Sequence, residues 1–84
     1  MLAECVIRKI LGNFDALKPV IIELSKDEDL FARGLDSFGS VQLMLALEEH
    51  FNIEFPDHLL NRRSFSTIRI IQDTVATLTG GVAA

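Results

Sequence analysis

The chain has 84 residues, about half of them hydrophobic by type, and carries 8 Lys and Arg against 12 Asp and Glu, for a formal net charge of -4. This length fits one small domain, close to the lower limit at which a hydrophobic core alone stabilises a fold. A single cysteine excludes an internal disulfide and a multi-thiolate metal site, and it suits a reducing compartment.

The length and composition of the chain predict a simple organisation. We expect one domain over residues 1–79, a flexible tail at 80–84, and a monomer in the cytoplasm. The N-terminal stretch lacks the continuous apolar run of a signal peptide, and we expect no insertion into a membrane.

The charge is unevenly distributed along the chain. Residues 23–57 contain nine acids against only Lys26 and Arg33. Such a surface disfavours nucleic-acid binding, which needs clustered Lys and Arg, and it suits docking to basic patches on protein partners. A solvated surface that keeps a small protein soluble explains the same pattern.

The first element predicted is an amphipathic helix, because apolar residues recur there at spacings of three and four. The residues of this stripe are Ala3, Val6, Ile7, Ile10, Leu11 and Phe14. Gly12 and Asn13 weaken the end of the helix. Cys5 lies beside the stripe, which predicts a partly buried and inert thiol.

A long link over residues 18–35 follows, and a link of this length in a compact domain usually has a function or is tethered to the core. Its charged segment, residues 26–29, is expected to remain in water. The apolar residues available as tethers are Val20, Ile21, Ile22, Leu24, Leu30, Phe31 and Leu35.

Two further periodic segments predict helices from about residue 36 to 51 and from about residue 66 to 78, the latter with Ser66 as its N-cap. Between them, Pro56 can open a single helical turn and Asn61 can close it, which predicts a short fourth helix. Because no alternation typical of strands competes, the sequence predicts an all-α bundle of three main helices and one short helix, with a long first loop.

The start of the second main helix combines a cap with an exposed hydroxyl. Asp36 is a favourable N-cap, which places Ser37 at the first helical position beside backbone N–H groups that lack helical partners. A phosphate on that hydroxyl sits well at the positive end of the helix dipole. Gly34 permits a sharp turn before the cap. On these local residues alone, the favoured interpretation is a plain helix cap followed by a tolerated small polar residue.

No catalytic or metal-binding residues are predicted. A nucleophile elbow at Ser37 needs glycine two residues before and two after, and position 35 is Leu. His50 lies on the same helix, roughly 20 Å from Ser37 at 1.5 Å per residue, and so does not supply a base. The chain has no metal-ligand cluster in its sequence.

The helix that begins at Ser37 is apolar over more than half of its circumference. We assign Leu43, Leu47 and Phe51 to the core. The apolar residues nearest the serine are then left as candidates for contact with partners. They are Phe38, Val41 and Leu45.

Four segments of this sequence resemble the phosphopantetheine attachment region of acyl carrier proteins. They are residues 34–38 (GLDSF), 41–43 (VQL), 47–53 (LEEHFNI) and 65–68 (FSTI). The resemblance implies an acyl-carrier-like four-helix bundle and covers nearly the whole chain. It also implies that a phosphopantetheinyl transferase moves 4′-phosphopantetheine from coenzyme A onto Ser37, within a motif that includes Asp36, and that the protein itself is not an enzyme.

Within this family, two features of the sequence distinguish it from the fatty-acid carriers. Many fatty-acid carriers have acids where this chain has Gly39 and Gln42. Residues 54–65 are instead similar to small stand-alone carriers that are loaded with amino acids by ligases resembling the catalytic core of seryl-tRNA synthetases. That likeness implies an aminoacyl thioester, such as a glycyl or alanyl one. It also places Arg62 and Arg63 on an exposed loop, where they contact a partner or the arm's phosphate, or are simply solvated.

Three functions remain open at this point. The first is an aminoacyl carrier loaded by an amino acid:carrier protein ligase. The second is an acyl carrier for fatty-acid, lipid or polyketide biosynthesis. The third is a helical protein-interaction module that is never modified.

Overall fold

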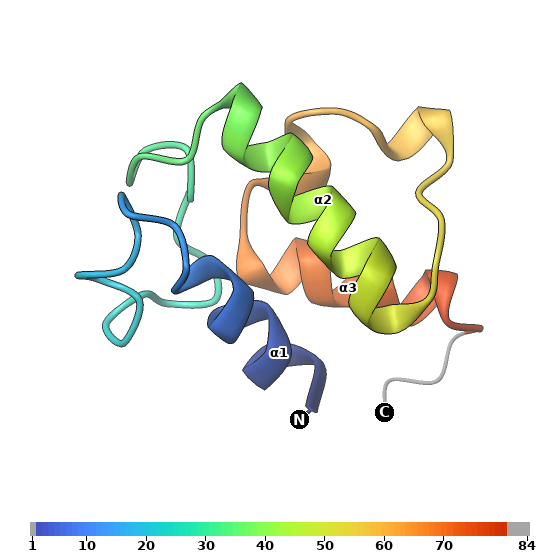
Figure 1. Cartoon of the computed structure of the whole chain (residues 1–84), viewed down its shortest axis with the longest axis horizontal. Coiled ribbons are helices and arrows are strands. Elements are labelled where there is room, and N and C mark those ends of the chain that lie inside the picture. Colours follow the sequence, from blue (N-terminus) through green and yellow to red (C-terminus); the bar gives the residue numbers. More distant parts are fainter. Residues whose placement is uncertain (1, 81–84) are drawn as a thin grey trace.

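Three α-helices carry the core in the computed structural model, which describes residues 2–80 (Figure 1). They are α1 (Leu2–Leu11), α2 (Ser37–Phe51) and α3 (Ile68–Leu78). Two single-turn 3-10 helices, η1 (Asp57–Leu59) and η2 (Arg63–Phe65), lie between α2 and α3. The side chains of Leu2 and Ala3 lie outside the described part, as does residue 1 and all of the predicted tail except Gly80.

The predicted all-α class is confirmed, with no strand in residues 2–80. The short fourth helix exists as the single turn η1, which begins after Pro56 as expected. Its C-cap is Leu60, one residue before the predicted Asn61, whose side chain donates to the His58 carbonyl of the turn at 3.0 Å. The turn η2 was not predicted, because its three residues are too few to show a period.

Helix α1 is shorter than its apolar stripe. It ends at Leu11, and Phe14 packs half-buried against the core from the loop beyond. Ile7 and Leu11 are fully buried. The prediction of a partly buried Cys5 is wrong, because this residue lies two positions before Ile7, about 200° around the helix from it, and is exposed.

The long loop between α1 and α2 is tethered as predicted, through the buried side chains of Leu24, Leu30 and Leu35. Leu17 is a further buried anchor that was not predicted. Ile22 was predicted as a tether but is 93% exposed. Its neighbours Val20 and Ile21 occupy the side of the turn that packs against the core, and Ile22 points away from it.

Backbone hydrogen bonds also hold this loop to the start of α3. The Leu30 N–H donates to the Ser66 carbonyl at 2.7 Å, and the Arg69 N–H donates to the Lys26 carbonyl at 2.9 Å. The backbone of Lys26 is therefore attached to α3, while Asp27 and Asp29 are exposed, as expected for this charged segment.

Ion pairs add to these contacts at the surface. The Asp27 carboxylate accepts two hydrogen bonds from the Arg69 guanidinium, at 2.6 and 3.1 Å. These bonds hold the pKa of Asp27 below its ordinary value and raise the pKa of Arg69. Within α1, the Arg8 side chain donates to Glu4 at 2.9 Å and lowers the pKa of Glu4 in the same way. Surface pairs of this kind stabilise a fold only slightly, so most of the stability comes from the hydrophobic core.

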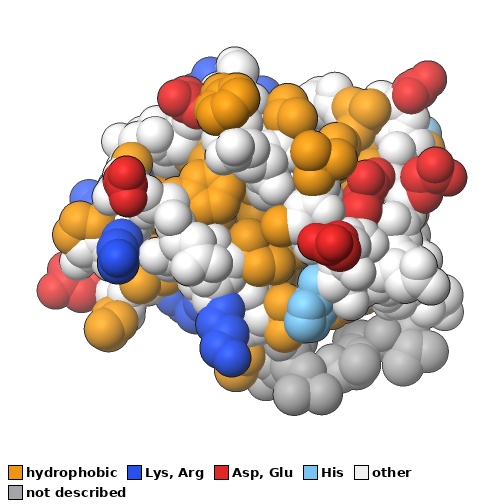
Figure 2. All heavy atoms as spheres, in the orientation of Figure 1, with side chains coloured by type: hydrophobic (Ala, Val, Ile, Leu, Met, Phe, Trp, Pro, Cys, Tyr) orange, Lys and Arg blue, Asp and Glu red, His pale blue; other side chains and the backbone are white. Residues whose placement is uncertain are grey.

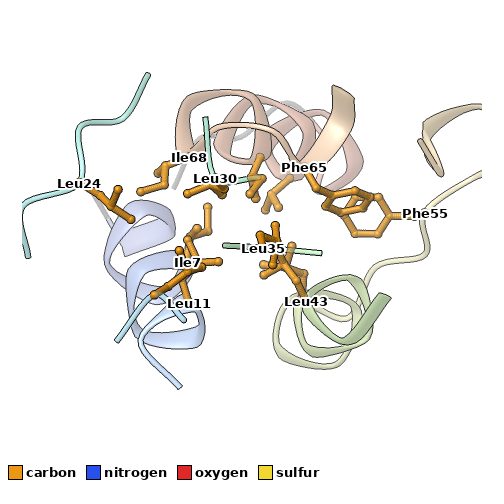
Figure 3. Packing of buried hydrophobic residues seen from close by; sticks show 13 residues of the cluster. Ile7, Leu11, Leu24, Leu30, Leu35, Leu43, Phe55, Phe65 and Ile68 are labelled. Atoms are coloured by element: carbon orange, nitrogen blue, oxygen red, sulfur yellow. The ribbon is translucent and has the colours of Figure 1, made fainter. Parts of the chain in front are cut away.

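The core joins residues from all three α-helices, the long loop, η2 and the segment before η1 (Figure 3). Helix α1 packs against both α2 and α3, and η2 packs against α3. The buried hydrophobic residues are Ile7, Leu11, Leu17, Leu24, Leu30, Leu35, Leu43, Leu47, Phe55, Phe65, Ile68, Ile71 and Val75. Because Leu30 and Leu35 belong to this cluster, the core itself holds the end of the loop that leads into α2.

Helix α3 begins one residue later than predicted. Thr67 has extended backbone angles, and its hydroxyl accepts a hydrogen bond from the Ile70 N–H at 3.1 Å, so Thr67 is the N-cap. Ser66, predicted for that role, still has helical angles at the end of η2 and donates its hydroxyl to the Arg63 carbonyl.

Candidate functional site

The start of α2 has the geometry that the sequence predicts. Asp36 has extended backbone angles, and its Oδ1 accepts a hydrogen bond from the Gly39 N–H at 2.7 Å. Ser37 is the first helical residue and is exposed. Asp36 therefore acts as the N-cap, and it fixes the direction in which the helix presents Ser37.

The Ser37 hydroxyl has no hydrogen-bond partner within the described residues. The N–H groups of Ser37 and Phe38 likewise have no acceptor there, as expected for the first turn of a helix. The neighbouring hydroxyl behaves differently, because Ser40 Oγ donates to the Ser37 carbonyl at 2.8 Å. Of these two serines, only Ser37 presents an uncommitted hydroxyl at the positive end of the helix.

Gly34 makes the turn that brings the chain from the core to this helix start. Its φ is +120°, and a Cβ atom built there would lie 2.8 Å from the Cβ of Ala16. The Leu35 N–H closes the turn by donating to the Leu30 carbonyl at 3.0 Å. Leu35 is thereby buried, while Asp36 and Ser37 emerge into solvent.

We expect Gly34→Ala to lower the free energy of unfolding by about 1–3 kcal/mol, because it combines a strained backbone angle with a clash. Gly80→Ala is the matched control, since Gly80 also has a positive φ, of +93°, but a Cβ atom there would meet nothing within 4 Å. Urea unfolding of the two variants measures the difference. Equal losses would show that the contact with Ala16 has no energetic role.

Gly39 explains one departure from fatty-acid carriers. It is buried, and a Cβ at this position would lie 3.0 Å from a Leu35 methyl group and 3.2 Å from both Asp36 Oδ1 and the Phe14 ring. No acidic side chain fits there while Phe14 keeps its place. The first turn of α2 has no acid at any of its positions.

Two grooves flank the start of α2. The first has a volume of about 320 Å³, and its residues come from α2, from η2 and the segment before it, and from the long loop. They are Phe31, Ser37, Ser40, Val41, Met44, Leu60, Asn61, Arg62 and Phe65. The second, of about 490 Å³, lies between residues 13–17 and residues 34–42 and includes Asp36 and Phe38.

The predicted partner-binding residues on α2 are exposed hydrophobic side chains. The exposed fractions are 72% for Phe38, 51% for Val41 and 54% for Leu45, while Leu43 and Leu47 are fully buried. Figure 2 shows hydrophobic side chains gathered over the region of α2, with acidic side chains near its C-terminal half. We call Phe38, Val41 and Leu45 the apolar face of α2. Phe51, assigned to the core, is half-buried at its edge.

The two arginines predicted to contact a partner or the arm have different surroundings in the structure. The Arg62 guanidinium lies over the Phe31 ring, 4.2 Å from its centroid, and Arg62 lines the same groove as Ser37. Arg63 is exposed and does not line that groove. Ser40 and Met44 were missed as groove residues, although their positions three and seven residues after Ser37 place them on its face of the helix.

Other kinds of site find no support in residues 2–80. No described helix has both the length and the apolar character needed to cross a bilayer. In the same range, no group of three or more His, Cys, Asp and Glu side chains is arranged to hold a metal ion.

Comparison with known proteins gives concordant results. The family model for the phosphopantetheine attachment site matches residues 6–79. The chain is 51% identical over 78 residues to the aminoacyl carrier protein of Agrobacterium fabrum, covering 93% of this chain and 94% of the relative. It is 39% identical over 71 residues to the D-alanyl carrier protein of Streptococcus uberis, covering 83% and 90% of the two chains.

Solved structures agree with this assignment. One similar chain comes from the crystal structure of an engineered Bradyrhizobium japonicum glycine:[carrier protein] ligase complexed with the carrier protein from Agrobacterium tumefaciens and ATP. The TM-score is 0.82 at 51% identity, covering 89% of this chain and 97% of that one. The corresponding complex with AMP gives a TM-score of 0.80 at 53% identity, covering 86% and 96%.

The residues at the start of α2 fit a covalently attached phosphopantetheine. They offer an exposed hydroxyl, unpaired N–H groups that favour an anion, and an adjoining groove that contains a cation. The chain therefore belongs to the phosphopantetheine-bearing carrier proteins, and it is a homologue of the aminoacyl carrier proteins within that family.

Proposed function

We propose that this chain carries an activated amino acid in the cytoplasm and that Ser37 is the residue to which its arm is attached. The observation that carries the proposal is 51% identity to an aminoacyl carrier protein across 93% of the chain. The exposed, uncommitted hydroxyl of Ser37 at the first position of α2 supports the choice of residue. In this proposal Asp36 and Ser37, which share one motif, both lie beside the arm.

Attachment is a phosphoryl transfer in which Ser37 supplies the nucleophile. Its Oγ forms a bond to the phosphorus of coenzyme A that bears the pantetheine, the pyrophosphate bond breaks, and 3′,5′-adenosine bisphosphate leaves. The hydroxyl proton passes to a base of the phosphopantetheinyl transferase. This chain contributes position rather than catalysis, since Asp36 bonds to the Gly39 N–H and neither histidine hydrogen-bonds to Ser37.

When bound, the arm supplies a terminal thiol that holds an aminoacyl group, such as glycyl or alanyl, as a thioester. The chain must then present Ser37 to a ligase and to later enzymes in turn. The apolar face of α2 begins beside that serine, and its exposed area is suited to brief docking. Small interfaces with rapid dissociation serve a carrier better than tight ones.

The proposed loading enzyme is an amino acid:carrier protein ligase that resembles a seryl-tRNA synthetase core. The carrier protein from Agrobacterium tumefaciens, to which this chain is similar, has been crystallised with an engineered glycine:[carrier protein] ligase. A monomeric carrier leaves both the apolar face of α2 and the exposed Arg62 and Arg63, at the start of η2, free for such a partner.

Loading assays test the proposed cargo. The phosphopantetheine-bearing protein is incubated with such a ligase, ATP and either glycine or alanine, and its intact mass is measured. We expect a gain of one amino acid less one water, which hydroxylamine reverses because it cleaves thioesters. A parallel reaction offers malonyl and long acyl groups with their own transferases. Loading of those groups in place of amino acids would contradict the aminoacyl assignment and favour fatty-acid, lipid or polyketide biosynthesis.

A further inference from the structure

The groove beside Ser37 is lined by a single charged side chain, and that charge is positive. Its wall on α2 includes Ser37, Val41 and Met44, and the opposite wall includes Leu60 and Arg62. Among the residues that line this groove, Arg62 is the only one with a charged side chain. Its volume of about 320 Å³ is at the small end of the range, roughly 300–1,000 Å³, found for ligand pockets.

Arg62 is held in place without a counter-ion. Its guanidinium lies over the Phe31 ring at 4.2 Å, and it forms no ion pair within residues 2–80. Stacking engages the face of the guanidinium and leaves the N–H groups at its edge available as donors. An unpaired cation fixed beside Ser37 is unexpected in a chain with a net charge of -4.

On the basis of the attachment proposed above, we propose that this groove is a docking site for the chain's own phosphopantetheine arm, with Arg62 binding the phosphodiester. The phosphodiester carries one negative charge and is tied to Ser37, which itself lines the groove. Arg62 provides the opposite charge in a geometry suited to phosphate oxygens. Val41, Met44 and Leu60 give apolar walls for the methyl and methylene groups of the pantetheine.

The same charge distribution affects the aminoacyl end of the arm. An aminoacyl thioester has a free α-ammonium group, which is positively charged at neutral pH and is repelled by Arg62. The covalent bond to Ser37 keeps the phosphate end of the arm in the groove with Arg62, and this repulsion directs the aminoacyl end away from the arginine. The groove orders the base of the arm and leaves the cargo accessible to a partner.

Comparison of apo and arm-bearing protein by NMR tests this inference. Intact mass first establishes that each sample carries the arm, and amide ¹H–¹⁵N shifts are then compared for wild type, Arg62→Gln and Arg63→Gln. The two variants lose the same charge one residue apart. We expect attachment to shift amides along both walls in wild type and Arg63→Gln, including those of Met44 and Leu60.

In Arg62→Gln, the shifts should be confined to Ser37 and its immediate neighbours. Raising the salt concentration to about 1 M, where the Debye length is near 3 Å, should reduce the shifts along the groove in wild type. Matching apo spectra of the two variants would show that both are folded.

The possible failures are distinguishable. An arm that is attached but shifts only the neighbours of Ser37, or equal shifts in the two arginine variants, overturns the docking site and leaves the carrier function intact. Absence of any mass gain overturns the attachment and this inference together.

Discussion

Ser37→Ala is expected to abolish attachment of phosphopantetheine completely. Incubation of the wild-type protein with coenzyme A and a broad-specificity transferase should add roughly 340 Da, as a phosphoester of the serine, and the variant should gain nothing. The fold should be unaffected, because Ser37 is exposed and its hydroxyl bonds to no described residue. Substitutions at such positions usually change stability by less than about 0.5 kcal/mol.

Ser40→Ala is the matched control for this experiment. It removes the same atom one helical turn away, where the hydroxyl already donates to the Ser37 carbonyl at 2.8 Å. We expect the full mass gain to persist in this variant. A mass gain in Ser37→Ala would place the arm on another residue, and no gain in the wild-type protein would favour an unmodified interaction module.

The second large effect concerns two leucines on α2 that differ in burial. Leu43 is fully buried in the core, whereas Leu45 is 54% exposed. We expect Leu43→Ala to lower the free energy of unfolding by about 2–5 kcal/mol, because it leaves a cavity among packed side chains. Small domains have a total stability of about 5–15 kcal/mol, so the loss is a large fraction. Urea denaturation measures it directly.

Leu45→Ala should impair loading by the ligase while leaving the stability of the fold almost unchanged. Its effect on the free energy of unfolding should stay within about 0.5 kcal/mol, since little packing is lost at an exposed position. Loading by the ligase should weaken about tenfold in kcat/KM, which corresponds to roughly 1.4 kcal/mol of binding energy. Unchanged loading would exclude Leu45 from the docking surface, and a stability loss equal to that of Leu43→Ala would show that its side chain supports the core.

Several predictions from sequence failed where a residue's environment depends on distant parts of the chain. Ile22 has the same apolar character as its neighbour Ile21, yet only Ile21 packs against the core. Phe14 continues the spacing of α1 but packs from the loop, because the helix has already ended. Ser66 and Thr67 are both suitable caps, and the choice between them follows from the turn η2 that precedes them.

The α-helical class, the three helices and the Asp36 cap followed by an exposed Ser37 could be deduced from the sequence alone. Each depends on interactions between residues a few positions apart, such as the 3.6-residue period and the bond from a cap to the third residue after it. The groove beside Ser37 and the difference between Arg62 and Arg63 were decided by the tertiary structure. Both depend on how Phe31 and residues 60–65 are brought against α2, and that placement is set by packing between segments far apart in the chain, which no local pattern encodes.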